Sequence, residues 1–269
     1  MVPALYPMQH PFKTGTPGAP VLAELQEAAM TNPTAAMLII GDEILSGRTR
    51  DANMHHLAKA LTSHGIDLEE VRVVADVPDA ITEAVKALAA RYTHVFTSGG
   101  IGPTHDDITA DNVARAFDRP IDVRDDARAI LAAHYDRQGI ELNEARLRMA
   151  RIPEGATLIE NPISAAPGFS LENVHVMAGV PAIFEAMVAG VLPTLTGGAP
   201  ILSQSLQLLR GEGDIAATLG QIAEEFPELS FGSYPFQLNG AFGTNVVVRG
   251  SDAARLDAAM AALDRAFPA

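Results

Sequence analysis

The chain has 269 residues, 48% of them hydrophobic and 5% aromatic, which suffices for one large domain or for a medium and a small one. A formal net charge of −14 means that the surface as a whole repels nucleic acid and anionic lipid. Cysteines are absent, which excludes disulfides and thiolate catalysis. No apolar run approaches the roughly 20 residues of a membrane-spanning helix. We therefore expect a cytoplasmic protein with no nucleic-acid or membrane partner.

The first 34 residues contain six prolines and few apolar stretches, which predicts a flexible extension with one short helix over residues 21–30. Beyond residue 34, short apolar runs alternate with segments of helical periodicity. Strands are predicted over residues 35–40, 68–74, 94–97 and 174–177, and helices over residues 53–64, 79–88, 109–117, 125–138, 143–150 and 181–189. The predicted N-terminal caps are Asn53, Asp79 and Asn143. This alternation implies right-handed crossovers and an α/β fold with a mostly parallel sheet.

A break in the pattern occurs at Pro193 and over residues 197–200, which read GGAP. We place a domain boundary there, so that residues 35–198 form the larger domain and residues 199–269 form a small α+β domain. Within the small domain, strands are predicted over residues 203–209, 229–234 and 245–249, and helices over residues 214–225 and from a cap at Ser251 or Asp252 to about residue 267.

The segment TSGGIGPTHDDITADN, residues 97–112, links one predicted strand to the next predicted helix. It consists of a glycine-rich turn with flanking hydroxyl groups, formed by Gly99, Gly100, Gly102 and Pro103 with Thr97, Ser98 and Thr104. Glycine lets the backbone approach a ligand closely, and backbone amides between a strand and a helix bind anions. We therefore predict a phosphate site here, and a tight turn without a ligand is the alternative.

Acidic residues follow two of the predicted strands. Asp42 and Glu43 come after the first strand, and Asp106 and Asp107 come after the glycine turn. If they lie at one edge of the sheet, their negative charges oppose the binding of a phosphate. A divalent cation relieves this repulsion, and ligands that are all oxygen favour Mg²⁺ or Mn²⁺. Helix capping by Asp42 and Asp107 is the alternative.

Four segments occur in a characteristic order: GDEILSGRTRDAN (41–53), TSGGIGPTHDDIT (97–109), NPISAAPGF (161–169) and AGVPAIFEAM (178–187). Together they resemble the MoaB/Mog-like molybdopterin-binding domain, most closely its branch in the competence/damage-inducible protein CinA. The resemblance covers residues 35–195, and the segment FGSYPF (231–236) resembles the small middle domain that follows in this branch. Ala52 and Ser164 depart from the family pattern, in which Thr is usual and Gly is frequent at these positions.

The resemblance implies a three-layer α/β/α fold in which the glycine turn holds a ligand at the strand ends. It also implies that Asp107 handles a metal ion or the ligand, and Asp107 and Asp106 are the predicted catalytic residues. The predicted metal ligands are Asp42, Glu43 and Asp107. The predicted ligand-binding residues are Gly41, Asn53, Thr97, Ser98, Gly99, Gly100, Gly102, Pro103, Thr104 and Thr109. Relatives assemble as dimers or trimers, so we expect a homo-oligomer.

Two functions follow from the resemblance. The CinA branch is associated with divalent-metal-dependent hydrolysis of ADP-ribose and related dinucleotide pyrophosphates, and we favour this activity, with Mg²⁺ or Mn²⁺ as the cofactor. The molybdopterin-handling relatives act on a pterin phosphate, so the alternative is a molybdopterin-binding protein without hydrolase activity. A third interpretation is a regulatory protein whose pocket is vestigial. In the first two cases the partner is a small nucleotide or pterin phosphate.

Overall fold

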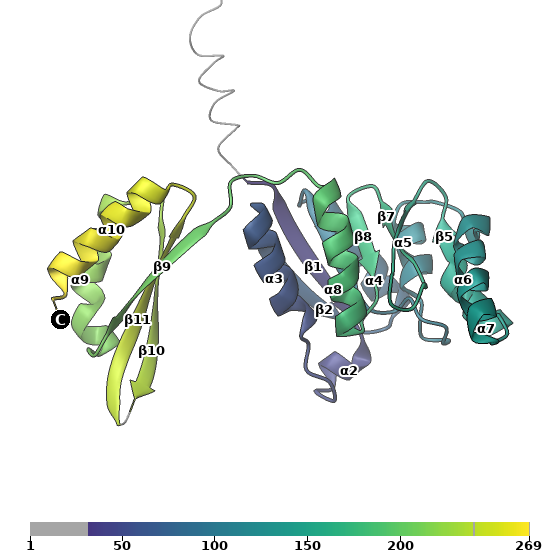
Figure 1. Cartoon of the computed structure of the whole chain (residues 1–269), viewed down its shortest axis with the longest axis horizontal. Coiled ribbons are helices and arrows are strands. Elements are labelled where there is room, and N and C mark those ends of the chain that lie inside the picture. Colours follow the sequence, from purple (N-terminus) through teal and green to yellow (C-terminus); the bar gives the residue numbers. More distant parts are fainter. Residues whose placement is uncertain (1–31, 239, 269) are drawn as a thin grey trace, which may run out of the picture. The chain divides into compact units, whose positions relative to one another are not determined.

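A computed structural model describes residues 32–238 and 240–268 of the chain. The helix predicted over residues 21–30, and the extension around it up to residue 31, lie outside the described residues. Within the described part, no helix is long and apolar enough to cross a membrane. The secondary structure falls into two sets of elements, one over residues 34–194 and one over residues 202–266 (Figure 1).

The larger domain is built on a six-stranded sheet in the order β2-β1-β3-β8-β7-β6 (Figure 1). Its strands are β1 (Thr34–Ile40), β2 (Asp67–Val74), β3 (His94–Ser98), β6 (Thr157–Ile159), β7 (Gly168–Leu171) and β8 (Val174–Met177). β2, β1, β3 and β8 run parallel to one another, whereas β7 and β6 are antiparallel to their neighbours. The predicted mostly parallel sheet is therefore confirmed.

Helices cover both faces of this sheet. They are α2 (Asp42–Leu45), α3 (Asn53–His64), α4 (Pro78–Ala89), α5 (Thr109–Ala116), α6 (Asp125–Gln138), α7 (Glu144–Leu147) and α8 (Pro181–Val191). A two-stranded ribbon and two 3-10 helices complete the domain: β4 (Ile121–Val123), β5 (Arg151–Pro153), η1 (Arg148–Ala150) and η2 (Leu192–Thr194). In Figure 1, α3 and α8 lie in front of the sheet, and α4 and α5 lie behind it.

The side chains of β1 explain why there are two helical layers. Ala36, Leu38 and Ile40 belong to the core that α4, α5 and α6 cover. Met37 and Ile39, which alternate with them, belong to the core under α3 and α8. Successive side chains of a strand point to opposite faces, so a strand buried on both faces is apolar throughout. The domain thus has the three-layer α/β/α fold that the resemblance implies.

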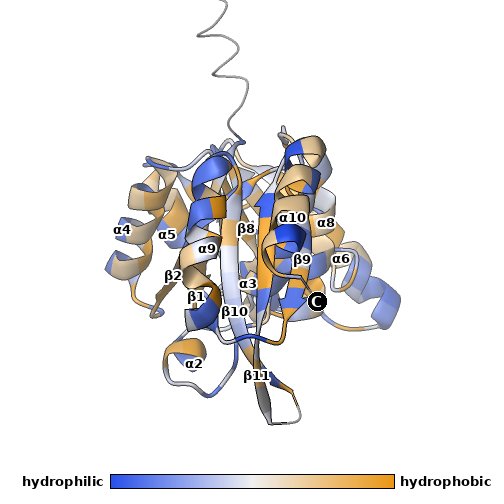
Figure 2. Ribbon diagram, turned by 90° about the vertical axis from the view of Figure 1, so that its left-hand side faces the viewer, coloured by the Kyte–Doolittle hydropathy of each residue, from blue (hydrophilic) through white to orange (hydrophobic). Residues whose placement is uncertain are grey.

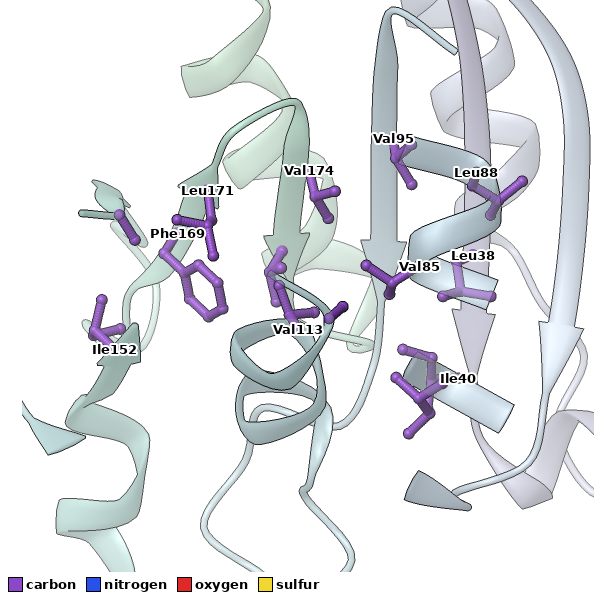
Figure 3. Packing of buried hydrophobic residues seen from close by; sticks show 14 of the residues in the cluster. Leu38, Ile40, Val85, Leu88, Val95, Val113, Ile152, Phe169, Leu171 and Val174 are labelled. Atoms are coloured by element: carbon purple, nitrogen blue, oxygen red, sulfur yellow. The ribbon is translucent and has the colours of Figure 1, made fainter. Parts of the chain in front are cut away.

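The core on the α4 side fixes the helix that follows the glycine turn. Figure 3 shows Val85 and Leu88 of α4 beside the strands that carry Leu38 and Val95, and Val113 of α5 in the same cluster. All five side chains are fully buried. Burying a side chain of this size contributes about 1.5–3 kcal/mol relative to leaving it exposed. With β3 and α5 both anchored in this core, the segment between them has fixed ends.

The smaller domain has an antiparallel sheet in the order β10-β11-β9 and two helices. Its elements are β9 (Leu202–Leu208), α9 (Glu212–Glu225), β10 (Ser230–Leu238), β11 (Ala241–Gly250) and α10 (Ala253–Ala266). Ile215 of α9 and Leu256 and Leu263 of α10 are buried in one cluster with Val246 and Val248 of β11. Hydrophilic and hydrophobic residues alternate along these helices (Figure 2), as expected for helices with one buried side. The predicted α+β domain is confirmed.

Some local predictions require correction. Asn53 is the first residue of α3 instead of its cap, and Asp51 accepts the hydrogen bond from the first turn at 3.0 Å. Asp79 likewise lies in the first turn of α4 and does not cap it. Asn143 and Asp252 do cap α7 and α10, as predicted. The sequence pattern does not predict β4 to β7, which have three or four residues each; strands this short show little periodicity, and of those described only β8 was predicted.

Candidate functional site

A cavity of about 530 Å³ lies at the C-terminal ends of the parallel strands. Its walls come from five segments: Gly41 and Glu43 after β1, Asp76 after β2, residues 99–103, 106 and 107 after β3, residues 161, 164 and 166 before β7, and residues 178–181 and 183 after β8. In open α/β sheets the strand-to-helix loops meet at this edge, and ligands bind there. The fold therefore brings the glycine turn and most of the predicted acidic residues to one cavity.

Two glycines of the turn adopt a backbone conformation that other residues avoid. The φ angle is 106° at Gly99 and 69° at Gly100, in the region that glycine favours. A Cβ atom at Gly99 would lie 2.3 Å from the carbonyl oxygen of Ile40, so no side chain fits there. The N–H groups of Gly100, Ile101 and Gly102 donate to no acceptor among the residues that the structure describes. These amides are therefore available to an anion in the cavity.

Two glycines make room for acidic side chains. A Cβ atom at Gly41 would lie 2.5 Å from Oε2 of Glu43, and one at Gly102 would lie 2.6 Å from Oδ2 of Asp107. Both carboxylates fold back over a glycine, and both residues line the cavity. The glycines of the two motifs thus position acidic groups in addition to shaping the backbone.

Thr104 holds the two adjacent aspartates. Its Oγ1 lies 2.5 Å from Oδ1 of Asp106 and 2.6 Å from Oδ2 of Asp107, and its backbone N–H donates to the same Asp107 oxygen at 2.8 Å. The hydrogen bond from Thr104 keeps the pKa of Asp106 below its ordinary range. A hydroxyl group has one proton, so Thr104 can donate to only one of these carboxylates at a time. The contact of Oγ1 with the carboxylate that receives no proton brings two oxygen atoms together, and it is favourable only when a cation or a further proton is present.

Asp76 is a cavity residue that the motifs do not reveal. It accepts a hydrogen bond from the backbone N–H of Asp42 at 2.9 Å. Partial burial, together with the negative charges of Asp42, Glu43 and Asp106, raises the pKa of Asp76 above its ordinary range. Its position directly after a strand is the signal that could have identified it, because the same rule singles out Asp42 and Glu43.

Some predicted ligand residues lie behind the cavity wall. Thr97 and Thr109 are fully buried, and Thr109 donates to a carbonyl of the glycine turn at 3.0 Å. Ser98 and Asn53 are each 3% exposed. Nδ2 of Asn53 donates to Oγ of Ser98 at 2.7 Å and to the carbonyl oxygen of Gly179 at 2.8 Å. Asn53 therefore ties the turn after β3 to the loop after β8, and a direct contact of these four side chains with a ligand stays a prediction.

Other predicted residues lie outside the cavity lining. The side chain of Asp42 is exposed at the start of α2, so its contact with a metal ion stays a prediction. Thr104 is exposed as well and contacts the two aspartates. Pro103 lines the cavity, and its contact with a ligand stays a prediction. Asn161, which also lines the cavity, holds its own loop: its Oδ1 accepts from the N–H groups of residues 163 and 164 at 3.1 Å each. The departure from the family pattern at Ser164 thus falls on a cavity wall.

The charge of the cavity determines what it can bind. Its lining includes the carboxylates of Glu43, Asp76, Asp106 and Asp107 and no lysine, arginine or histidine. Within residues 32–238 and 240–268, no three side chains of His, Asp or Glu already lie close enough together to hold a metal ion. Mg²⁺ is commonly held by one or two carboxylates together with substrate phosphate and water. The acidic residues fit that mode of binding, in which the ligand completes the coordination.

Comparison with known proteins assigns both domains. Residues 36–197 match the family described as "Probable molybdopterin binding domain", and this match covers more than half of the chain. The chain belongs to this family. The resemblance to MoaB/Mog-like domains is therefore confirmed. Residues 200–269 match a second family, described as "FAD synthase, middle domain".

Relatives place the chain in the CinA branch of the molybdopterin-binding family. A protein from Caldivirga maquilingensis is 36% identical over 165 residues, which are 60% of this chain and 64% of the relative. A CinA-like protein from Desulfosudis oleivorans is 36% identical over 182 residues, 65% of this chain and 44% of the relative. A crystal structure of the protein CinA, of unknown function, from Thermoplasma acidophilum has a TM-score of 0.55 at 33% identity and covers 60% of this chain and 97% of that one. This chain covers less than two thirds of the first two relatives.

Proposed function

We propose that this chain is a divalent-metal-dependent hydrolase of nucleotide pyrophosphates such as ADP-ribose. One observation carries the proposal: free backbone amides and four carboxylates line the same cavity. The amides suit a phosphate, but the carboxylates repel one. A divalent cation bound between the phosphate and the carboxylates removes this repulsion, since it attracts both groups.

Each part of the cavity has a separate task in this proposal. The amides of residues 100–102 bind phosphate oxygens and stabilise the charge that develops on them during the reaction. Glu43 and Asp107 would hold the ion, and Asp76 and Asp106 add negative charge around it. When bound, Mg²⁺ or Mn²⁺ supplies electrostatic stabilisation of the phosphate charge. The oxygen of a water molecule bonds to one phosphorus, the bridging P–O bond breaks, and the products are two phosphate monoesters.

The test is the release of AMP from ADP-ribose by the purified chain, with Mg²⁺ or with a chelator. We expect turnover that requires the ion and that Asp107→Asn reduces by at least about 100-fold, because this change removes a charge from the centre of the site. Asp136→Asn is the matched control, since Asp136 is exposed on α6 and lies away from the cavity. An Asp107→Asn variant with unchanged turnover would falsify this mechanism.

The description of the family carries a second candidate function, the binding of molybdopterin without hydrolysis. The same amides serve a pterin phosphate, and catalysis is not needed. Titration of the chain with a molybdopterin precursor and with ADP-ribose separates the two functions. Saturation by the pterin at one equivalent, with no release of AMP from ADP-ribose, favours the second.

A further inference from the structure

A smaller cavity of about 70 Å³, which we call the side lobe, adjoins the cavity described above. The two share the lining residues Ile40, Glu43, Thr49, Gly99, Gly179 and Pro181. The side lobe extends from the glycine turn toward the loop that joins α2 to α3, where Arg50 forms part of its wall. The two cavities therefore lie side by side at the glycine turn.

The side lobe contains a cationic side chain, and the main cavity does not. Arg50 is the one cationic side chain in the lining of either cavity. Among the residues that the structure describes, it forms no ion pair within 4 Å, although the chain carries a net charge of −14. A guanidinium group presents five N–H donors in a planar fork that matches a phosphate group. The main cavity has no cationic side chain in its lining, whereas the side lobe places Arg50 beside two carboxylates. One belongs to Glu43, a proposed ligand of the metal ion, and the other to Asp51, whose Oδ2 accepts from the backbone N–H of Met54.

We infer that the side lobe binds the second phosphate group of the substrate through Arg50, so that the site selects ligands with two linked phosphates over those with one. The inference rests on the proposed function and specifies its substrate class. One phosphate lies at the amides of residues 100–102, beside the acidic residues, and the next lies at Arg50. Substrate selection then depends on a residue outside the acidic cluster.

Asn53 provides a second feature of the side lobe. Its Oδ1 is buried and has no hydrogen-bond partner among the described residues, while its Nδ2 is fully used by Ser98 and Gly179. A buried acceptor without a partner is costly and is normally paired with water or a ligand. A phosphate does not supply a proton, but the sugar hydroxyl next to a phosphate does. The side lobe therefore contains a donor for the phosphate, Arg50, and an acceptor for the sugar hydroxyl, Oδ1 of Asn53.

The test compares α,β-methylene-ADP, which has two linked phosphorus groups and is not hydrolysed between them, with AMP. Calorimetry in the presence of Mg²⁺ measures both affinities for the wild type and for Arg50→Ala. We expect the wild type to bind α,β-methylene-ADP between about 10 and 100 times more tightly than AMP, the range for a charge-assisted hydrogen bond. In Arg50→Ala this ratio should fall to near one while the affinity for AMP stays the same. Arg48→Ala, in the same exposed loop but outside both linings, should keep the wild-type ratio.

Two results overturn the inference in different ways. If the wild type hydrolyses ADP-ribose but Arg50→Ala keeps the preference for two phosphates, the inference is wrong and the proposed function stands. If the wild type binds neither ligand and releases no AMP from ADP-ribose, both are wrong. Equal losses in Arg50→Ala and Arg48→Ala also count against the inference, because they point to general electrostatic attraction.

Discussion

The pH dependence of stability should be controlled in part by His175, a buried residue of β8. Its side chain is 4% exposed, with Nδ1 2.8 Å from Oγ of Ser170 and Nε2 3.4 Å from Nδ1 of His94. Burial, with a smaller contribution from His94, lowers the pKa of His175 from 6.5 to about 4. Between these two values the unfolded chain binds a proton at this position and the folded chain does not. Protonation therefore favours unfolding as the pH falls.

The size of the effect follows from the two pKa values. Stability from this residue is complete above pH 6.5 and decreases as the pH falls toward the folded pKa of about 4. At about 1.4 kcal/mol per pH unit, the loss is about 2 kcal/mol at pH 5 and about 3 kcal/mol at pH 4. Such a loss is a large part of the stability of an ordinary domain.

Two measurements check this reasoning. Titration of the His175 ring followed by NMR should give a pKa near 4. Hydrogen exchange at the amides of β3 and β8 reports the opening of this sheet alone, so unfolding of the smaller domain does not enter. His175→Gln should flatten the dependence of that opening free energy on pH between 4 and 6.5, and His105→Gln, at a ring that is 99% exposed, should not. A ring that titrates near 6.5, or a His175→Gln variant with the wild-type slope, refutes the argument.

Three further substitutions test the local structure. Gly102→Ala places a Cβ atom 2.6 Å from an oxygen of Asp107, so it should weaken Mg²⁺-dependent nucleotide binding at least about tenfold by calorimetry. Gly190→Ala is the control, because a Cβ atom there meets nothing within 4 Å. It should leave binding unchanged and stabilise α8 by up to about 1 kcal/mol. Asn53→Leu should cost about 2–3 kcal/mol, because it leaves two buried hydrogen-bond partners unpaired, and an unchanged melting temperature would contradict this. Asp252→Ala removes the cap of α10 and should lower the free energy of unfolding by about 1 kcal/mol in urea titrations.

Much of the fold could be predicted from the sequence because the relevant forces are local or periodic. The apolar run of β1 indicates a strand buried on both faces, and the alternation of strands with helices indicates parallel pairing. The order of the motifs around Gly41 and Gly99 was sufficient to indicate the family. The glycine turn was predicted from its three closely spaced glycines, and the structure adds that positive φ angles at Gly99 and Gly100 require glycine there.

The composition of the site, in contrast, was decided by tertiary structure. Asp76 lies 34 residues from Asp42 in sequence, and only the pairing of β1 with β2 places the two together. Asn53 looks like a helix cap in sequence, but the packing of α3 directs its amide to Ser98 and Gly179. These outcomes depend on contacts between distant segments, which no local pattern records. The sequence therefore determined which groups line the strand ends, and the packed sheet determined which of them face the cavity.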